Sequence, residues 1–504
     1  MSMPAELVTT TITLSDLLQD FAQAPAIDIH GISSDSRALR PGDLFLACGG
    51  ATGHGLDYVA DAVTAGVAAI AWDSSTASAP ATDVGVPMVA VPDLAQHVGE
   101  IANRFYDRPS NAVRVVGITG TNGKTTVAWL IAQCCEQLDL RCGYVGTLGT
   151  GIGEVEAGDG MTTPGAVELH GHLASFRDQG AAAAAIEVSS HALEQNRVDG
   201  VVFDTVLFTN LSRDHLDYHG DMQSYGEAKA KLFLQYGARH RIINLDTEFG
   251  TQLANRCGQE VVTVSSKFDR VANGRPYVFV RSVVARNGGF KVGVSSSWGD
   301  AEFELHLAGE FNVANAVLVL ALLLRHGVPM DKACDVLSGV SAPPGRMQRV
   351  AAGNGMPAVY IDYAHTPEAL NVALRALRPH CKGKLWCVFG CGGDRDTGKR
   401  SEMGKMADRG ADRLVITNDN PRFEDPSKII DAIIAGVTRT DRATVIEDRS
   451  AAVAWAIAEA GADDVILIAG KGHEDYQLIG AERRDFSDYA AAEENLKRRA
   501  EVSA

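Results

Sequence analysis

A strand, a glycine-rich turn and a helix follow one another between residues 113 and 138. The apolar run at 113–118 leads into Thr119-Gly-Thr-Asn-Gly-Lys-Thr-Thr126, and the next segment carries apolar residues at i, i+3, i+4 and i+7. At such a junction the backbone amides and the helix dipole converge on an anion. Lys124 adds a positive charge, and a threonine hydroxyl can bind Mg²⁺. The pattern therefore predicts a cradle for a triphosphate.

The spacing of this loop departs from the general P-loop pattern G-x-x-x-x-G-K-[ST]. Ile118 occupies the position of the first glycine of that pattern. An ordinary tight turn between a strand and a helix is therefore the alternative interpretation. Gly-Lys-Thr-Thr placed directly at a strand-to-helix turn favours the phosphate cradle.

Length and charge limit the class of protein. A chain of 504 residues is too long for one core and suggests about three domains. The net charge of -17 argues against a general nucleic-acid binder. The nine cysteines show no CxxC spacing, which is typical of reduced thiols. The N-terminal residues lack signal-peptide features, and no apolar run is long enough for a membrane span. We expect a cytoplasmic protein.

The order of predicted elements indicates an α/β fold with domains at 1–107, 108–342 and 343–504. Short strands and helices alternate in the first domain, and Arg108-Pro-Ser110 is a candidate linker. Residues 260–306 alternate apolar and polar positions, which predicts an antiparallel excursion. Buried strands are predicted at residues 181–188, 201–209, 242–244, 359–361, 385–389, 414–417 and 465–469.

Charged and polar side chains follow several of these strands, where ligands collect in doubly wound sheets. Glu187 ends one strand and could hold Mg²⁺, with His191 and His215 on nearby loops. For a histidine on such a loop, a satisfied hydrogen bond is the alternative.

The loops of the third domain carry both signs of charge. Arg395 and Arg422 could bind carboxylates, and Asp419 and Glu474 could bind an ammonium group. Together they suit a zwitterionic amino acid, and solvated loop charges are the alternative. A phosphate cradle with an amino-acid pocket favours an ATP-dependent amide ligase over a P-loop switch, in which the third-domain loops would have no role.

Long motifs along the chain resemble the Mur ligases. They are Thr119-Gly-Thr-Asn-Gly-Lys-Thr-Thr126, Glu187-Val-Ser-Ser-His-Ala-Leu193, Phe208-Thr-Asn-Leu-Ser-Arg-Asp-His-Leu-Asp-Tyr-His-Gly220, Gly345-Arg-Met347, Asp362-Tyr-Ala-His-Thr-Pro367 and Asp419-Asn-Pro-Arg422. The resemblance implies the three-domain architecture of that family, with a central P-loop-like ATPase domain on a mostly parallel sheet and a Rossmann-like C-terminal domain. It also implies ATP and Mg²⁺ as cofactors and a role in peptidoglycan precursor synthesis.

The resemblance further implies a reaction and its substrates. The enzyme would add meso-2,6-diaminopimelate to UDP-N-acetylmuramoyl-L-alanyl-D-glutamate through an acyl phosphate, with no nucleic-acid or membrane partner and as a monomer. His215 or a nearby carboxylate could accept the proton of the attacking amine. A lysine-adding ligase and a folate-polyglutamate ligase are the related alternatives; Arg422 disfavours the first, and the extra first domain disfavours the second.

Roles carried over from the family fall on matching positions of this chain. Lys124, Glu187, His215 and Lys229 would be catalytic, and the metal would lie near Thr125, Glu187, His215 and Lys229. Residues that would hold ATP are Gly120, Thr121, Asn122, Gly123, Lys124, Thr125, Thr126, Asn312, Arg346 and Asp362. Residues that would bind the two other substrates are Ser34, Ser36, Thr162, Thr163, Ser189, Gln195, Arg197, Arg395, Asp419, Asn420, Pro421, Arg422, Gly470 and Glu474. The loop Ala51-Thr-Gly53 would contact the uridine end mainly through its backbone.

Two of these positions carry a chemical argument of their own. Lys229 matches a lysine that the family carbamylates, which would turn a cation that repels Mg²⁺ into an anionic oxygen ligand. Lys231 is a near neighbour, so this choice depends on register. Asp419-Asn-Pro-Arg422 is the family's mark for meso-diaminopimelate, because Arg422 can bind the distal carboxylate that lysine lacks.

Overall fold

The computed structural model describes residues 12–50, 53–78, 84–158, 160–267, 273–286, 288–353 and 355–503. The chain forms two compact units, Met1–Val262 and Thr263–Ala504. The described helices include none that is both long and apolar enough to cross a membrane. All nine cysteines are free thiols, as the sequence predicts. The predicted loop contacts at Ala51 and Thr52 lie outside the described residues, as does most of the N-terminal segment.

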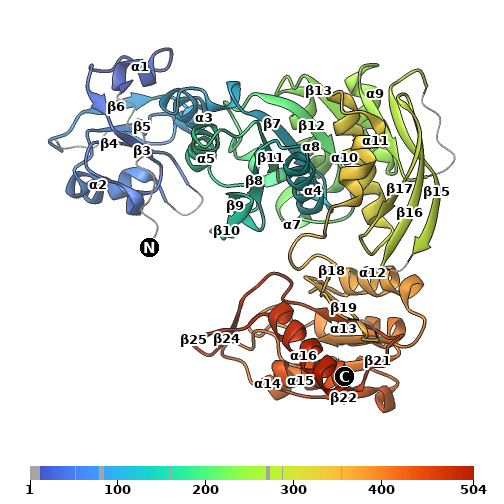
Figure 1. Ribbon diagram of the computed structural model, residues 1–504. Helices are drawn as coiled ribbons and strands as arrows, with labels where there is room; N and C mark the ends of the chain where they lie inside the picture. Colours follow the sequence, from blue (N-terminus) through green and yellow to red (C-terminus); the bar gives the residue numbers. More distant parts are fainter. Residues whose placement is uncertain are drawn as a thin grey trace. The chain divides into compact units, whose positions relative to one another are not determined.

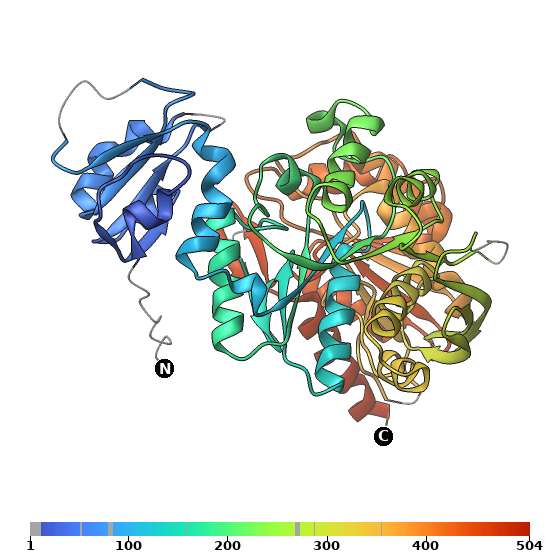
Figure 2. The same ribbon diagram turned by 90° about the horizontal axis from the view of Figure 1, so that it is seen from above.

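The first unit begins with a small parallel sheet in the order β3-β4-β5-β6 (blue in Figures 1 and 2). Alternate residues of its central strand face opposite sides: Leu44 and Leu46 pack with α1 and α3, whereas Phe45 and Ala47 pack with α2. The elements are β1 (Ile12–Thr13), α1 (Leu14–Leu18), β2 (Asp28–Ile29), β3 (Gly31–Ser33), β4 (Asp43–Ala47), α2 (Val59–Ala65), β5 (Ala69–Asp73), β6 (Met88–Val91) and α3 (Leu94–Phe105).

The same unit contains the predicted phosphate loop on a second sheet, in the order β10-β9-β8-β11-β7-β12-β13. Strands β8, β11, β7, β12 and β13 pair in parallel, so their carboxyl ends lie at one edge. The elements are β7 (Arg114–Thr119), α4 (Lys124–Gln137), β8 (Cys142–Gly146), β9 (Gly149–Ile152), β10 (Glu154–Glu156), α5 (Ala166–Asp178), β11 (Ala183–Glu187), α6 (Ser190–Glu194), β12 (Phe203–Phe208), α7 (Leu216–His219), α8 (Met222–Leu234), β13 (His240–Asn244) and α9 (Glu248–Cys257). The antiparallel β8–β9–β10 turn-back was not predicted from the sequence.

The second unit opens with the predicted antiparallel excursion, which the structure confirms. Strand β15 pairs antiparallel with β16, and β16 pairs antiparallel with β17. The apolar positions Val278, Val280 and Val292 are buried, because every second side chain of a strand faces the same way. The elements are β14 (Val262–Ser265), β15 (Tyr277–Arg286), β16 (Gly289–Ser296), β17 (Gly299–Leu305), α10 (Phe311–Arg325) and α11 (Met330–Ser338).

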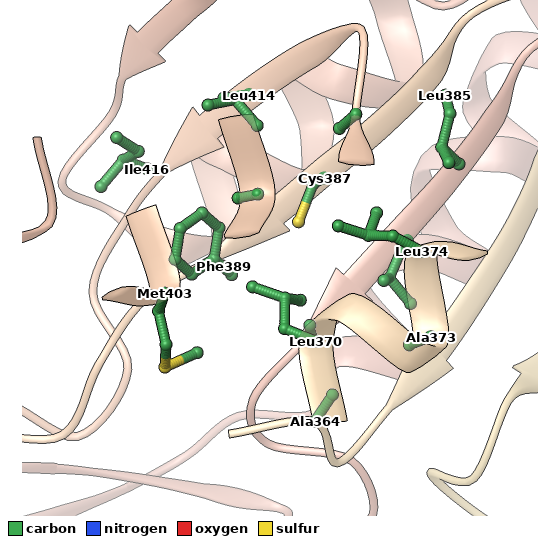
Figure 3. Close-up of a cluster of buried hydrophobic side chains, with 14 of the residues drawn as sticks. Ala364, Leu370, Ala373, Leu374, Leu385, Cys387, Phe389, Met403, Leu414 and Ile416 are labelled. Carbon is green, nitrogen blue, oxygen red and sulfur yellow. The ribbon is translucent and has the colours of Figure 1, made fainter. Parts of the chain in front are cut away.

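A doubly wound sheet follows in the second unit, in the order β18-β19-β23-β20-β21-β22. Figure 3 shows one of its faces, where Cys387 and Phe389 pack against Leu370 and Leu374 of α12. The intervening residue Val388 faces α15 and α16 on the other side. The elements are β18 (Gln348–Arg349), β19 (Ala358–Asp362), α12 (Pro367–Leu377), β20 (Leu385–Phe389), α13 (Lys399–Gly410), β21 (Arg413–Ile416), α14 (Pro426–Ile434), β22 (Ala443–Val445), α15 (Arg449–Glu459), β23 (Val465–Ala469), β24 (Tyr476–Ile479), β25 (Glu482–Asp485) and α16 (Asp488–Ser503). The predicted α/β class, with its parallel sheets, is confirmed.

A fully buried ion pair holds the strand ends of this sheet. Arg449 donates from Nε and Nη2 to the two carboxylate oxygens of Asp488, both at 2.7 Å. The same guanidinium donates to the carbonyls of Asn418 (3.1 Å) and Ala469 (2.9 Å). One buried cation thus fixes the chain at the ends of β21 and β23.

We expect Asp488→Ala to lower the free energy of unfolding by about 3–5 kcal/mol, because Arg449 would keep its buried charge without a counter-ion. Chemical denaturation measures the change. Glu494→Ala is the matched control: Glu494 pairs with Arg498 on the solvent side of the same helix, α16, with both side chains more than half exposed. Loss of this exposed ion pair should lower the free energy of unfolding by about 0.5 kcal/mol or less. Equal effects of the two substitutions would contradict the structural role of Arg449.

Candidate functional site

The phosphate loop has the geometry that the sequence predicts, and two of its glycines cannot be replaced without strain. Gly120 has a φ of +146°, and a Cβ there would lie 1.9 Å from the Thr209 hydroxyl oxygen. Gly123 caps α4 with a φ of +88°. Helix α4 therefore starts at Lys124, where the first-turn amides and the helix dipole favour an anion.

The loop is held by the segment that follows β12. Asn122 accepts hydrogen bonds at its carbonyl from the Thr209 hydroxyl (2.6 Å) and the Asn210 amide (3.0 Å), and its own backbone N–H donates to the Asn210 side chain. Thr121 accepts from the Ser212 backbone N–H at 3.0 Å. The motif at 208–220 thus supports the phosphate loop through hydrogen bonds.

Two lysines reach one carbonyl of the loop. Lys124 Nζ donates to the carbonyls of Gly120 and Thr121, and Lys229 Nζ donates to that of Gly120, all at 2.9 Å. Lys229 is only 1% exposed and lies over the Tyr225 ring. Burial, reinforced by the charge of Lys124, lowers the pKa of Lys229 well below its usual range.

The neighbouring Lys231 has a different environment. Its Nζ forms a 2.7 Å ion pair with Glu194 and remains about one-third exposed. The geometry therefore favours Lys229 over Lys231 as the lysine that acts at the cradle.

The Glu187 carboxylate, at the end of β11, is buried and accepts four hydrogen bonds. Oε2 accepts from the Thr125 hydroxyl (2.8 Å) and the Thr147 hydroxyl (3.3 Å). Oε1 accepts from the Tyr144 hydroxyl (2.6 Å) and the Thr147 backbone N–H (2.9 Å). This cluster joins the first turn of α4 to the ends of β8 and β11, and its oxygens are hard donors that suit Mg²⁺.

The residues predicted to bind the UDP-linked substrate form a connected set. The Thr163 hydroxyl donates to the Glu187 carbonyl at 2.7 Å and accepts from the Ser189 backbone N–H at 3.0 Å. Arg197 donates to the Thr163 carbonyl at 3.0 Å and also contacts Gln195. The structure brings these residues together with Thr162, whose hydroxyl accepts from the Thr147 hydroxyl at 3.3 Å.

The predicted histidines converge, although not on Glu187. The rings of His191 and His215 lie 5.0 Å apart, and His219 lies 5.5 Å from His191. Burial and the neighbouring histidines lower the pKa of His191. His215 Nε2 is 3.5 Å from Asp214. Among the described residues there is no cluster of three or more His, Cys, Asp or Glu side chains suited to a metal, so the metal role of His215 stays a prediction.

In the second unit, three polar side chains are hydrogen-bonded to one another near the carboxyl ends of β21 and β23. Buried Lys471 donates to Asn420 Oδ1 (3.1 Å) and Glu474 Oε2 (3.2 Å), and Asn420 Nδ2 donates to the same Glu474 oxygen. Gly470 has a φ of +118°, and a Cβ there would lie 2.5 Å from an Asp419 carboxylate oxygen. Asp419, Asn420, Gly470 and Glu474 are therefore neighbours, as predicted; Lys471 was missed.

Arg422 lies on an adjacent loop with a φ of +52°. The hydrogen bonds that its guanidinium makes within the described chain come from Nη1, to the carbonyls of Gly393 (2.9 Å) and Asn420 (3.5 Å). A Cβ on Gly392 would lie 3.0 Å from Arg422 Nη1 and 3.8 Å from Cγ of Arg395. Both predicted arginines thus border one glycine loop, and Pro421 lies beneath it.

Arg422 is also where the β24–β25 hairpin is attached. Its backbone N–H donates to the Leu478 carbonyl (2.9 Å), and its carbonyl accepts from the Gly480 N–H (2.7 Å). The sequence analysis did not predict this hairpin, whose charged second strand resembles a loop in composition.

Of the remaining predicted positions, Asp362 borders the strand-end site of the second unit, because the Gly470 backbone N–H donates to its carbonyl at 3.1 Å. Asn312, in α10, donates to the Ala308 carbonyl at 2.7 Å and is buried. Asp362, at the end of β19, accepts from the backbone N–H groups of residues 347 and 364, while Arg346 lies over the Tyr363 ring. In the first unit, Ser34 is exposed and Ser36 begins a short 3₁₀ turn. The structure does not test the proposed roles of these residues.

A buried arginine of α13 joins the loop at Gly392 to the loop at Glu424. Arg400 donates to both oxygens of Glu424, at 2.6 and 2.7 Å, and to the Gly392 carbonyl. The guanidinium lowers the pKa of Glu424 to about 2. The charged carboxylate is therefore favoured in the folded state.

Because the pKa of Glu424 is lowered by folding, its contribution to stability is complete above its ordinary pKa of 4.5 and is lost as the pH falls through about 2. At neutral pH, we expect the Glu424→Gln variant to have a lower free energy of unfolding than the unaltered protein. This difference in free energy should become smaller as the pH falls, and denaturation at a series of pH values measures it. A difference that stays constant down to about pH 2 would contradict the lowered pKa of Glu424.

The protein has an anion-binding loop on one parallel sheet and a site for charged groups at the strand ends of another. These two features together are typical of a nucleotide-dependent α/β enzyme. Family models described as "Mur ligase family, catalytic domain", "Mur ligase middle domain" and "Mur ligase, glutamate ligase domain" match residues 28–106, 118–323 and 345–472. The chain belongs to the Mur ligase family.

Several curated relatives and one solved structure share a name. A curated protein of Pseudomonas putida, named UDP-N-acetylmuramoyl-L-alanyl-D-glutamate--2,6-diaminopimelate ligase, is 45% identical over 96% of this chain and 98% of its own. A protein of the same name from Coxiella burnetii is 43% identical over 96% and 99%. A solved structure of a ligase of that name has 31% identity and a TM-score of 0.73, covering 97% of this chain and 100% of its own.

Proposed function

We propose that the protein is an ATP-dependent ligase that joins meso-2,6-diaminopimelate to UDP-N-acetylmuramoyl-L-alanyl-D-glutamate in peptidoglycan precursor synthesis. The single observation that carries the proposal is the near full-length match to relatives with that name. The site supports it: one unit holds a phosphate cradle, and the other holds a pocket with both signs of charge. Nucleotide-linked substrates place the reaction in the cytoplasm.

The reaction has two steps. A carboxylate oxygen of the D-glutamyl residue attacks the γ-phosphorus of ATP, so that an acyl phosphate forms and ADP leaves. The amine of diaminopimelate then attacks the acyl carbon, an amide forms, phosphate leaves and a proton is lost. Lys124 and the first-turn amides of α4 stabilise the negative charge on the phosphates.

Magnesium fits the residues at the cradle. Thr125 and Glu187 offer oxygen ligands within one cluster, and a nucleotide-bound Mg²⁺ takes only one or two protein ligands besides phosphate and water. The ion would neutralise charge between the phosphates. Lys229, as a carbamate, would add an anionic oxygen.

The acceptor pocket explains the choice of amino acid. Glu474 and Asp419 suit the ammonium group of one amino-acid centre of diaminopimelate, and the guanidinium of Arg422, with Arg395 beside it, suits a carboxylate. Lysine lacks the second carboxylate and would leave the charge of Arg422 unpaired.

Supplied with ATP, Mg²⁺ and the UDP-muramoyl-dipeptide, the protein should release phosphate and form the tripeptide product faster with meso-diaminopimelate than with L-lysine. Arg422→Ala should lower kcat/KM for diaminopimelate about 100-fold, or about 3 kcal/mol, and reduce the ratio of kcat/KM for diaminopimelate to that for lysine. Arg498→Ala, on an exposed pair, is the control. Turnover without any amino-acid dependence would refute the ligase proposal; faster turnover with lysine would refute diaminopimelate as the substrate and the role of Arg422.

Carbamylation of Lys229 has a direct test. A neutral amine adds CO2, with loss of one proton, and the lowered pKa of Lys229 makes the neutral amine available. With ¹³C-labelled bicarbonate, we expect a carbamate carbon signal that Lys229→Arg abolishes and Lys231→Arg retains. Retention of the signal in the Lys229 variant, or its loss only in the Lys231 variant, would move the assignment to another lysine.

A further inference from the structure

The end of β8 carries two hydroxyl groups that have no role in the chemistry described so far. Tyr144 lies within the strand, and Thr147 follows its last residue. Both side chains donate to the Glu187 carboxylate, and the Tyr144 bond is the shortest of the four that it accepts, at 2.6 Å. Neither residue contributes an atom to the phosphate loop itself.

We propose that Tyr144 and Thr147 are positioning residues that orient the Glu187 carboxylate toward Thr125. The inference rests on the proposed function, because it assigns Glu187 to the nucleotide-bound Mg²⁺. The two donors on Oε1, from the Tyr144 hydroxyl and the Thr147 backbone, hold that oxygen at the end of β8. Oε2 accepts from the Thr125 hydroxyl at the start of α4 and, at the longer distance of 3.3 Å, from the Thr147 hydroxyl.

Burial makes this orientation costly to change. Glu187 is 1% exposed and Tyr144 is 2% exposed, so water cannot replace a donor that is lost. Gly146 leaves the space that the carboxylate uses, since a Cβ there would lie 2.1 Å from Oε1 and 2.6 Å from the Tyr144 hydroxyl. Glycine at position 146 therefore leaves room for the hydrogen bond between Tyr144 and Glu187.

The Tyr144 ring is held by packing as well as by its hydroxyl. The ring is buried and meets Trp129 edge-on, with centroids 5.6 Å apart. Because the ring is packed in this way, removal of the hydroxyl alone tests the hydrogen bond to Glu187 without removing the ring.

Thr147 extends the arrangement to the other substrate. Its hydroxyl contacts Glu187 Oε2 and also the Thr162 hydroxyl, both at 3.3 Å, while its backbone N–H contacts Oε1. Thr162 and Thr163 are the residues proposed for the UDP-linked substrate. The turn after β8 therefore links the metal-binding carboxylate to the site of the carboxylate that is phosphorylated.

Two isosteric substitutions isolate the hydroxyl groups. Tyr144→Phe removes one donor, and Thr147→Val removes the hydroxyl while keeping the backbone N–H. Loss of such an outer contact weakens metal sites by about 10-fold or more. We expect each variant to need about 10-fold more Mg²⁺ for half-maximal rate and to bind a non-hydrolysable ATP analogue with Mg²⁺ about 10-fold more weakly in calorimetry. The KM for diaminopimelate should stay within about twofold, and high Mg²⁺ should restore most of kcat.

Tyr236→Phe is the matched control, because it removes a tyrosine–carboxylate hydrogen bond to Asp199 in the same unit. Unchanged Mg²⁺ dependence and analogue binding in the Tyr144 and Thr147 variants would overturn the inference while leaving the ligase intact. A loss of kcat that Mg²⁺ does not restore, matched by Tyr236→Phe, would reduce the two residues to a structural role and also overturn it. An unaltered protein that binds the analogue but forms no amide would refute the proposed function, whereas the binding comparison would still test the inference.

Discussion

A buried carboxylate at the end of β11 is the constraint on which the nucleotide side of the molecule depends. Glu187 accepts four hydrogen bonds from hydroxyl groups and a backbone N–H, and within the part of the chain that the structure describes none of these donors is an arginine or a lysine. An ionised carboxylate in such a place is stabilised only in part by neutral donors. A divalent cation supplied with the nucleotide would balance the negative charge of this carboxylate. The arrangement of this region would therefore be connected to its proposed role in binding the nucleotide with Mg²⁺.

In the second unit, the buried charge has its counter-ion within the protein itself. Arg449 and Asp488 neutralise each other in the core, and the remaining donors of the guanidinium fix the Asn418 and Ala469 carbonyls. Those carbonyls immediately precede Asp419 and Gly470. The acceptor pocket is therefore built on a permanent ion pair, so its geometry does not wait for a ligand.

Short-range patterns in the sequence predicted many of the strands and the start of the helix at the phosphate loop. The apolar runs of β20 and β23 gave strands with the predicted bounds, and Gly-Lys-Thr-Thr at a strand end located the start of α4. The predicted family and α/β class are confirmed by the relatives and by the sheets. Tyr144, Lys471 and Arg449 could not be found in this way. Each acts through a partner distant in sequence. Tyr144 and Lys471 stand in apolar or glycine-rich runs that predict only a strand or a turn, and Arg449 stands at the start of helix α15, where a charged residue is usually exposed.

Two buried lysines show why residue type alone does not assign a role. Lys471 has a carboxylate partner, Glu474, and an amide partner, Asn420, so its charge is balanced within the protein. Lys229 has the Gly120 carbonyl and an aromatic ring, and Lys124 shares that carbonyl. The charge of Asp214 favours the ammonium form of Lys229, while burial and Lys124 both oppose it. Conversion of this amine to an anion would replace repulsion between two cations at one carbonyl by attraction, and it would do so at the cradle that is proposed to bind Mg²⁺.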